Sequence, residues 1–230
     1  MSRSTFALLV LPCLVSAALL TWSALRQDAG RAGDEPEAFE EGPVRHFPTR
    51  EMTVASLGMI DRAALAFRAR ATDGRTYDLG ELLARGPVVL TFIKDGCPCS
   101  AAAQPYFNAL HAAYPSASTL GVIDVEGEEA GRWAEANRPG YPLLCDPAGE
   151  LIRGYGAENS AYVVLIDPRG RIARHWPGYS AAMLLELGAT LAVMTGSPKA
   201  ALDFRDAPSE LYTGCPYDFE EAAATSCPSP

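Results

Sequence analysis

The chain has 230 residues, 48% of them hydrophobic, which is enough for one globular domain with appendages. Its formal net charge of -9 at pH 7 and its pI of about 4.9 exclude nucleic acid as a partner, because no basic patch is visible. Six cysteines are too few for a fold held together mainly by disulfides at this length.

The N-terminal segment carries no charge from residue 6 to residue 25. A run of about 20 such residues is long enough to cross a bilayer, and no clean cleavage site of small residues follows it. We therefore expect residues 1–25 to form a transmembrane anchor, with a cleaved signal sequence as the alternative. Either interpretation places the rest of the chain outside the cytoplasm, tethered to the membrane in a periplasm-like compartment or secreted.

Residues 26–51 are rich in Gly, Pro, Asp and Glu and poor in apolar side chains, which predicts a flexible linker. We expect His46, which lies in this segment, to be solvated. A globular pattern then runs from residue 52 to residue 198. Residues 199–230 return to Pro, Ser, Asp and Glu and predict a tail, which carries Cys215 and Cys227.

Apolar runs bounded by turn signals predict the elements of the globular domain. We expect extended segments at residues 65–71, 76–83, 88–93, 118–125, 141–145, 161–167 and 171–176. We expect helices at residues 101–114, 126–137, 151–155 and 180–194. Strands joined through helices favour a parallel sheet, and the late hairpin adds antiparallel strands. The predicted fold class is therefore α/β, with a central mixed sheet flanked by helices.

Two cysteines, Cys97 and Cys99, lie where the strand at 88–93 gives way to a helix. The free N–H groups and the dipole at a helix N-terminus stabilise an anion and so lower the pKa of a thiol. A thiolate is the nucleophile in disulfide and peroxide chemistry. We therefore expect the sulfur of Cys97 to be exposed at the helix start and ionised near neutral pH.

This arrangement resembles the thioredoxin fold, and more closely the redoxin branch that contains the alkyl hydroperoxide reductase/thiol-specific antioxidant group. The likeness covers about residues 52–196. It is carried by the segments FRARATDGRTYD, GPVVLTFIKDGCPCS, YPLLCDPAGELIRGYG and YVVLIDPRGRI. The resemblance implies that Cys97, five residues after the strand residue Phe92, is the nucleophile.

The chain departs from both main branches of that family. Thioredoxins have two residues between their cysteines, whereas only Pro98 intervenes here. Peroxiredoxins have a threonine where this chain has Lys94. Thioredoxins have a cis-proline, and peroxiredoxins a nearby arginine, where this chain has Ala161.

The remaining candidate residues each have two interpretations. Cys99 either forms a strained, easily reduced disulfide with Cys97 or waits in the first helical turn for a distant partner. Lys94 either favours the thiolate through its charge or is a solvated loop residue. Cys215 either pairs with Cys227 or returns to Cys97 or Cys99 as a resolving thiol. Simpler roles are expected for the others: Cys145 as a small buried thiol, His111 and His175 as ordinary half-buried histidines, Trp133 and Trp176 as core residues.

The leading hypothesis is a membrane-anchored thiol–disulfide oxidoreductase in which Cys97 attacks and Cys99 or Cys215 resolves. The alternatives are a thiol peroxidase that reduces hydroperoxides, a copper chaperone of the Sco type that binds Cu(I), and an inactive redoxin that serves as a scaffold. The Sco resemblance requires a copper-binding histidine, and the matching position is Asn159. The expected partners are protein thiols or disulfides, or hydroperoxides, and an external thiol reductant. The leading hypothesis requires no cofactor and no metal.

Overall fold

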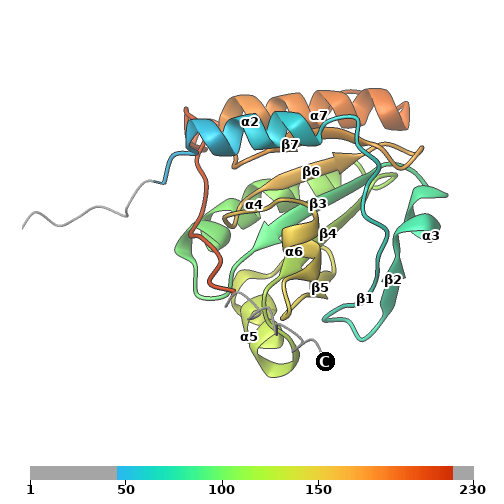
Figure 1. Cartoon of the computed structure of the whole chain (residues 1–230). Coiled ribbons are helices and arrows are strands. Elements are labelled where there is room, and N and C mark those ends of the chain that lie inside the picture. The colour runs from blue at the N-terminus through green and yellow to red at the C-terminus, as the bar shows by residue number, and fades with distance from the viewer. Residues whose placement is uncertain (1–45, 220–230) are drawn as a thin grey trace, which may run out of the picture. The chain divides into compact units, whose positions relative to one another are not determined.

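The computed structural model describes residues 46–219 (Figure 1). The expected anchor, most of the expected linker and two cysteines, Cys13 and Cys227, lie outside the described residues. Within residues 46–219, no helix combines the length and the apolar character that crossing a membrane requires.

A five-stranded mixed sheet forms the centre of the domain, in the order β5-β4-β3-β6-β7. Its strands are β3 (Val88–Ile93), β4 (Ser118–Ile123), β5 (Leu143–Cys145), β6 (Val163–Ile166) and β7 (Ile172–Trp176). β3, β4 and β5 are parallel, whereas β6 pairs antiparallel with β3 and β7 pairs antiparallel with β6. The predicted mixed sheet with an antiparallel hairpin is confirmed.

Helices cover both faces of this sheet (Figure 1). Side chains of a strand alternate between faces, so Val89 and Ile93 of β3 enter one apolar cluster while Leu90 and Phe92 enter the other. The first cluster is completed by α4 (Pro98–Ala113), α5 (Gly127–Asn137) and α7 (Ala181–Thr195). The second is completed by α2 (Arg50–Met59), α3 (Leu79–Leu83) and α6 (Glu150–Gly154). All six residues of β3 are buried, as its uninterrupted apolar run predicts.

Most predicted elements are confirmed, with shifted ends. The extended segment expected at 65–71 is shorter, as β1 (Arg68–Arg70), and pairs with β2 (Thr76–Asp78) in a separate two-stranded sheet. The expected segment 76–83 continues as helix α3, because Asp78 accepts a hydrogen bond from the N–H of Glu81 and so caps a helix. Helix α4 begins three residues earlier than predicted, at Pro98, a position where proline is well tolerated.

Helix α2 was not predicted. Thr49 and Met52 form a capping box at its start, and only Met52 and Ser56 are buried along it. Val54 and Leu57 are exposed, so the segment lacks the apolar stripe that marks a surface helix. The boundary expected at residue 52 therefore falls inside a helix.

The tail pairs both with the residues before α2 and with the domain itself. His46 forms an isolated β-bridge with Thr213, and Tyr179 forms one with Tyr212. His46 is half-buried, so the expectation that it is solvated was wrong. Within the described part of the expected tail, Phe204 and Thr213 are buried. These contacts bring the tail to the start of α4.

We predict that the face of helix α7 that packs against the sheet contributes strongly to the stability of the fold. Leu187 is fully buried, and its replacement in Leu187→Ala should lower the free energy of unfolding by about 2–5 kcal/mol through lost apolar burial and a residual cavity. Val193 is 83% exposed on the same helix, so Val193→Ala should change that free energy by no more than about 0.5 kcal/mol. Urea unfolding measures both, and equal effects would contradict the packing described.

Candidate active site

Cys97 occupies the junction between β3 and α4. It is the N-cap residue of α4, and Pro98 fills the first helical position. The junction is held in place by two hydrogen bonds: the N–H of Lys94 donates to Oγ of Ser100 at 3.2 Å, and the N–H of Asp95 donates to the Asp124 carboxylate at 2.7 Å. The sequence prediction that a thiol sits at a strand-to-helix junction is confirmed.

The sulfur of Cys97 lies in a polar niche made by other segments. The Sγ atom of Cys215 is 3.0 Å from it, and the two thiols share a hydrogen bond in which Cys215 is the donor once Cys97 is ionised. The hydroxyl of Ser160 donates at 3.3 Å, and the backbone N–H of Cys215 donates at 3.4 Å. Cys97 is only 4% exposed, so the expectation of an exposed sulfur was wrong. The tail covers the sulfur and at the same time supplies donors to it.

These contacts give the thiols different acidities. Burial raises the pKa of Cys97, but the hydrogen bonds from Cys215 and Ser160 together outweigh burial and lower the pKa to about 6. Burial, and the need to give up its hydrogen bond to Cys97, raise the pKa of Cys215 to about 12. Near neutral pH the pair therefore consists of a Cys97 thiolate and a Cys215 thiol.

Cys99 lies in the first turn of α4 and is also buried. Its sulfur is 3.4 Å from the phenolic oxygen of Tyr212, which belongs to the tail. Burial raises the pKa of Cys99, and the nearby charge of Cys97 raises it further. The hydrogen bond to Tyr212 lowers the pKa, but the net shift is upward. Cys99 is thus a protonated third thiol beside the pair.

The ammonium group of Lys94 contacts the tail. It donates to the backbone carbonyl of Pro216 at 2.6 Å and forms an ion pair with Asp218 at 2.6 Å. These partners follow Cys215 directly in the chain. Lys94 therefore ties the segment that carries Cys215 to the junction that carries Cys97.

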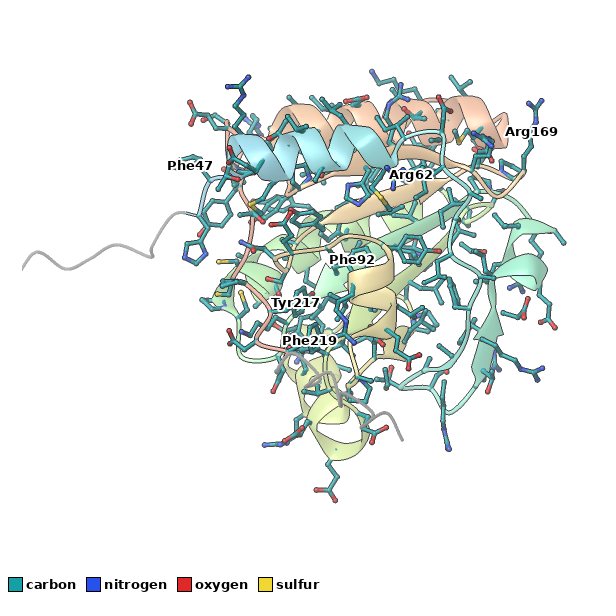
Figure 2. All side chains as sticks on the ribbon, in the orientation of Figure 1. Phe47, Arg62, Phe92, Arg169, Tyr217 and Phe219 are labelled. Atoms are coloured by element: carbon teal, nitrogen blue, oxygen red, sulfur yellow. The ribbon has the colours of Figure 1, made fainter. Side chains whose placement is uncertain are left out.

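Further contacts hold the same segment. The N–H of Ser160 donates to the carbonyl of Cys215, and the N–H of Gly214 donates to the carbonyl of Ser160. A Cβ atom at position 214 would clash with Ser160, so a glycine is needed for this approach. Beyond Cys215, the rings of Tyr217 and Phe219 stack at a centroid separation of 5.4 Å and pack against the second apolar cluster (Figure 2).

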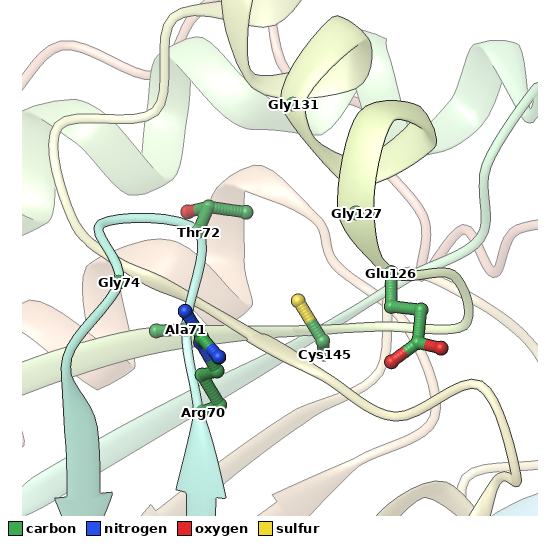
Figure 3. A pocket seen from close by; sticks show the side chains of 8 residues that line it. All are labelled: Arg70, Ala71, Thr72, Gly74, Glu126, Gly127, Gly131 and Cys145. Carbon is green, nitrogen blue, oxygen red and sulfur yellow. The ribbon is translucent and has the colours of Figure 1, made fainter.

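Cysteines help to line several pockets in the described part of the chain. Cys97 lines a pocket of about 330 Å³ together with Pro98 of α4 and with Arg132 and Trp133 of α5. A larger hollow of about 500 Å³ is lined by Arg70, Thr72, Glu126 and Cys145, among others (Figure 3). Burial raises the pKa of Cys145, so this second thiol is not activated.

Sequence reasoning missed Ser160 and Tyr212 as neighbours of the thiols. Ser160 immediately precedes Ala161, the position where thioredoxins have a cis-proline, and Ala161 has a left-handed backbone with φ of 63°. The N–H of Ala161 donates to the carbonyl of Phe92, which turns Ser160 toward the end of β3. The position of Ser160 just before strand β6 could have identified it from the sequence. No sequence feature could have identified Tyr212, because its contact with Cys99 depends on where the tail packs.

His175 of β7 and His111 of α4 pack within the fold, away from the thiols. His175 is buried, with one ring nitrogen 2.9 Å from the hydroxyl of Ser56 and the other 2.8 Å from the carbonyl of Tyr155. His111 is half-buried, with its ring against that of Tyr141. Trp133 lies in the first apolar cluster and Trp176 packs against it, as predicted.

Comparison with known proteins identifies the family of the chain. Residues 60–175 match the model of the AhpC/TSA family. The chain belongs to the AhpC/TSA family. It is therefore a redoxin, a thiol-based redox enzyme with a thioredoxin-like fold, as the resemblance implied. No curated protein matches the chain.

Solved structures share the redoxin fold at low sequence identity. A putative protein disulfide isomerase from Bacteroides thetaiotaomicron is 23% identical, with a TM-score of 0.54 over 60% of this chain and 91% of that one. A putative thiol:disulfide interchange protein DsbE from Chlorobium tepidum is 21% identical, with a TM-score of 0.54 over 60% and 98%. The peroxidoxin BcpB from Mycobacterium tuberculosis is 22% identical, with a TM-score of 0.50 over 60% and 97%.

We predict that one thiol of the reduced, metal-free redoxin ionises with a midpoint near pH 6, because the pKa of Cys97 is about 6. The ultraviolet absorbance of the thiolate reports this transition. The absorbance should disappear as the pH falls below the midpoint, and the transition should be absent in Cys97→Ser. Ser160→Ala removes a donor and should move the midpoint up toward the ordinary value of about 8.5. Cys145→Ser is the matched control and should leave it unchanged. A midpoint above about pH 8 in the unaltered chain would contradict the site described.

Proposed function

We propose that this redoxin is a thiol–disulfide oxidoreductase in which Cys97 is the nucleophile and Cys215 is the resolving thiol. The observation that carries the proposal is the 3.0 Å separation of their sulfur atoms, which belong to segments 118 positions apart in the chain. Such a contact needs only a small movement to become a bond of about 2.05 Å. Cys99, the other candidate resolving thiol, faces Tyr212 beside this pair.

The proposed exchange proceeds in two displacements. The thiolate of Cys97 attacks one sulfur of a protein disulfide, which forms a mixed disulfide and releases the first substrate thiolate. The thiol of Cys215 then gives up its proton and attacks the sulfur of Cys97, which forms the Cys97–Cys215 disulfide and releases the second substrate thiol. The substrate gains two electrons from the enzyme, one proton from Cys215 and one proton from solvent, and an external thiol reductant regenerates the Cys97 thiolate and the Cys215 thiol.

The difference in acidity between the two cysteines favours a particular regeneration step. In a disulfide, the sulfur whose thiol has the lower pKa is the better leaving group. Cys97 has the lower pKa of the two. Cys215 is half-buried, whereas Cys97 is buried, so Cys215 is the more accessible to an external thiol. We therefore propose that the external thiol attacks Cys215 and releases the Cys97 thiolate.

The proposal keeps the expected location and moves the start of the domain to the residues before α2. A tether formed by the residues that precede His46 would hold the domain on the extracytoplasmic side of a membrane, where protein disulfides persist. The tail at 199–230 would then be part of the active site, since it supplies Cys215 and the partners of Lys94.

We predict that Cys215→Ser traps the mixed disulfide. Without its resolving thiol, Cys97 should remain bonded to a substrate cysteine, and mass spectrometry should find that adduct. Cys97→Ser should form no adduct and should reduce a disulfide substrate no faster than buffer. Cys99→Ser is the matched control and should keep turnover. If Cys99→Ser traps the adduct instead and Cys215→Ser turns over, the assignment of the resolving thiol is wrong.

A second candidate function is reduction of hydroperoxides. It is favoured by the family membership and by Arg132, a cation that lines the same pocket as Cys97. The thiolate of Cys97 would attack the peroxide, forming a sulfenic acid and releasing an alcohol, and Cys215 would condense with the sulfenic acid and release water. The product is the same Cys97–Cys215 disulfide.

Rapid-mixing kinetics separates the two functions. For an oxidoreductase without peroxidase activity, we predict that peroxide oxidises the reduced chain no faster than it oxidises free cysteine. A much faster reaction that is lost in Cys97→Ser and slowed in Arg132→Ala would favour the peroxidase.

A further inference from the structure

We propose that the reduced chain binds a soft, thiophilic cation of the Zn²⁺ or Cu⁺ class through His46, Cys99 and Cys215. One ring nitrogen of His46 and the two sulfur atoms all lie within 4.8 Å of one another. The three residues come from three separate segments: the residues before α2, the first turn of α4 and the tail. This site goes beyond the proposed exchange reaction, which requires no metal.

The spacing of the donor atoms suits a single ion. Bonds from sulfur and nitrogen to Zn²⁺ are about 2.3 Å and 2.0–2.1 Å long, so two ligand atoms on one tetrahedral ion lie about 3.5–3.8 Å apart. The observed limit of 4.8 Å therefore requires the ligand atoms to approach one another by up to about 1 Å on binding, which side-chain rotation can supply. The sulfur of Cys97, 3.0 Å from that of Cys215, is placed to serve as a fourth ligand.

The chemistry of the donors selects the class of ion. Thiolate and imidazole ligands prefer Zn²⁺ and Cu⁺, whereas Mg²⁺ and Ca²⁺ prefer carboxylate and carbonyl oxygen. Within residues 46–219, the cluster contains no carboxylate, and Asp218 nearby is paired with Lys94. Two thiolates and a neutral imidazole balance the charge of a divalent cation, and the Cys97 thiolate as a fourth ligand would add one negative charge.

Neighbouring groups orient these ligands. The Nδ1 of His46 lies 3.2 Å from the carbonyl of Gly214 and donates to it, which leaves the lone pair of Nε2 to bind a metal. Backbone carbonyls commonly hold metal-binding histidines in this way. The β-bridge between His46 and Thr213 fixes the same residue against the tail, and Tyr212 contacts the sulfur of Cys99.

The nitrogen ligand is not at the position expected for a copper chaperone of the Sco type. Asn159 occupies that position, and its side-chain amide donates to the carbonyl of Gly214 at 2.9 Å. The carbonyl of Gly214 thus contacts both Asn159 and His46. The histidine comes from a segment that sequence reasoning treated as a linker.

The proposal predicts that metal binding and disulfide formation exclude each other. The sulfur of Cys215 can donate to a cation as a thiolate, but not when it is bonded to Cys97. Formation of that disulfide by an added disulfide oxidant removes two electrons from the two thiols and releases the ion. The reduced chain should therefore bind one equivalent, and the oxidised chain none.

Equilibrium dialysis of the full reduced chain against Zn²⁺, and separately against Cu⁺ under anaerobic conditions, tests this site. We expect one ion to bind per chain. In His46→Gln, Cys99→Ser and Cys215→Ser the affinity for the ion should fall by more than about 100-fold, because loss of an outer-shell contact alone typically costs about 10–100-fold. His111→Gln and Cys145→Ser are the matched controls and should bind normally. Circular dichroism of each variant separates loss of the ligand from loss of the fold.

Retention of neither ion by the reduced chain would overturn the proposal. Unchanged affinity in folded His46→Gln and Cys99→Ser would also overturn it, because the ion would then lie elsewhere. These outcomes are independent of the trapping experiment with a disulfide substrate, so the metal site and the exchange reaction fail or succeed separately.

Discussion

The pairing of the tail with the strand-to-helix junction is the contact on which the account depends. Reciprocal backbone hydrogen bonds between Ser160 and the 214–215 segment place the sulfur of Cys215 against that of Cys97. The Lys94–Asp218 ion pair and the stacked Tyr217 and Phe219 hold the next residues. Without this pairing, Cys97 would lose donors to its sulfur and also its nearest redox partner.

The sheet provides the fixed side of this arrangement. β3 is buried along its whole length and paired on both edges, so the junction that follows it has little freedom. The tail is held by polar contacts and by the packing of Tyr217 and Phe219 against the second apolar cluster, but Cys215 itself lies outside any strand or helix. A nucleophile fixed by the sheet and facing a thiol on an irregular segment suits a cycle in which the sulfur of Cys215 must approach, bond and withdraw.

Sequence reasoning recovered the parts of the fold that follow from local patterns. Uninterrupted apolar runs predicted β3, β4 and β6, and the helical spacing after Cys97 predicted α4, because each pattern reflects burial of that element's own side chains. Helix α2 was missed because its exposed Val54 and Leu57 break the apolar stripe, and a capping box at Thr49 was the signal that remained.

The site was predictable only in part, for a related reason. Cys97 was identifiable from its junction, and Cys215 entered the list of candidates through its chemistry. Which thiol Cys215 meets depends on contacts between residues more than 100 positions apart, such as those of Lys94 with Pro216 and Asp218. His46 and Tyr212 reach the thiols through the same long-range pairing, so no local pattern marks them.

The central claim is that Cys97 and Cys215 form the redox pair, and a disulfide map of the oxidised full-length chain tests it most directly. Mild oxidation, alkylation of the remaining thiols and mass spectrometry of the digested chain would identify the bond. The account predicts a Cys97–Cys215 disulfide, with Cys99 and Cys145 alkylated. A Cys97–Cys99 or a Cys215–Cys227 disulfide in its place would contradict it.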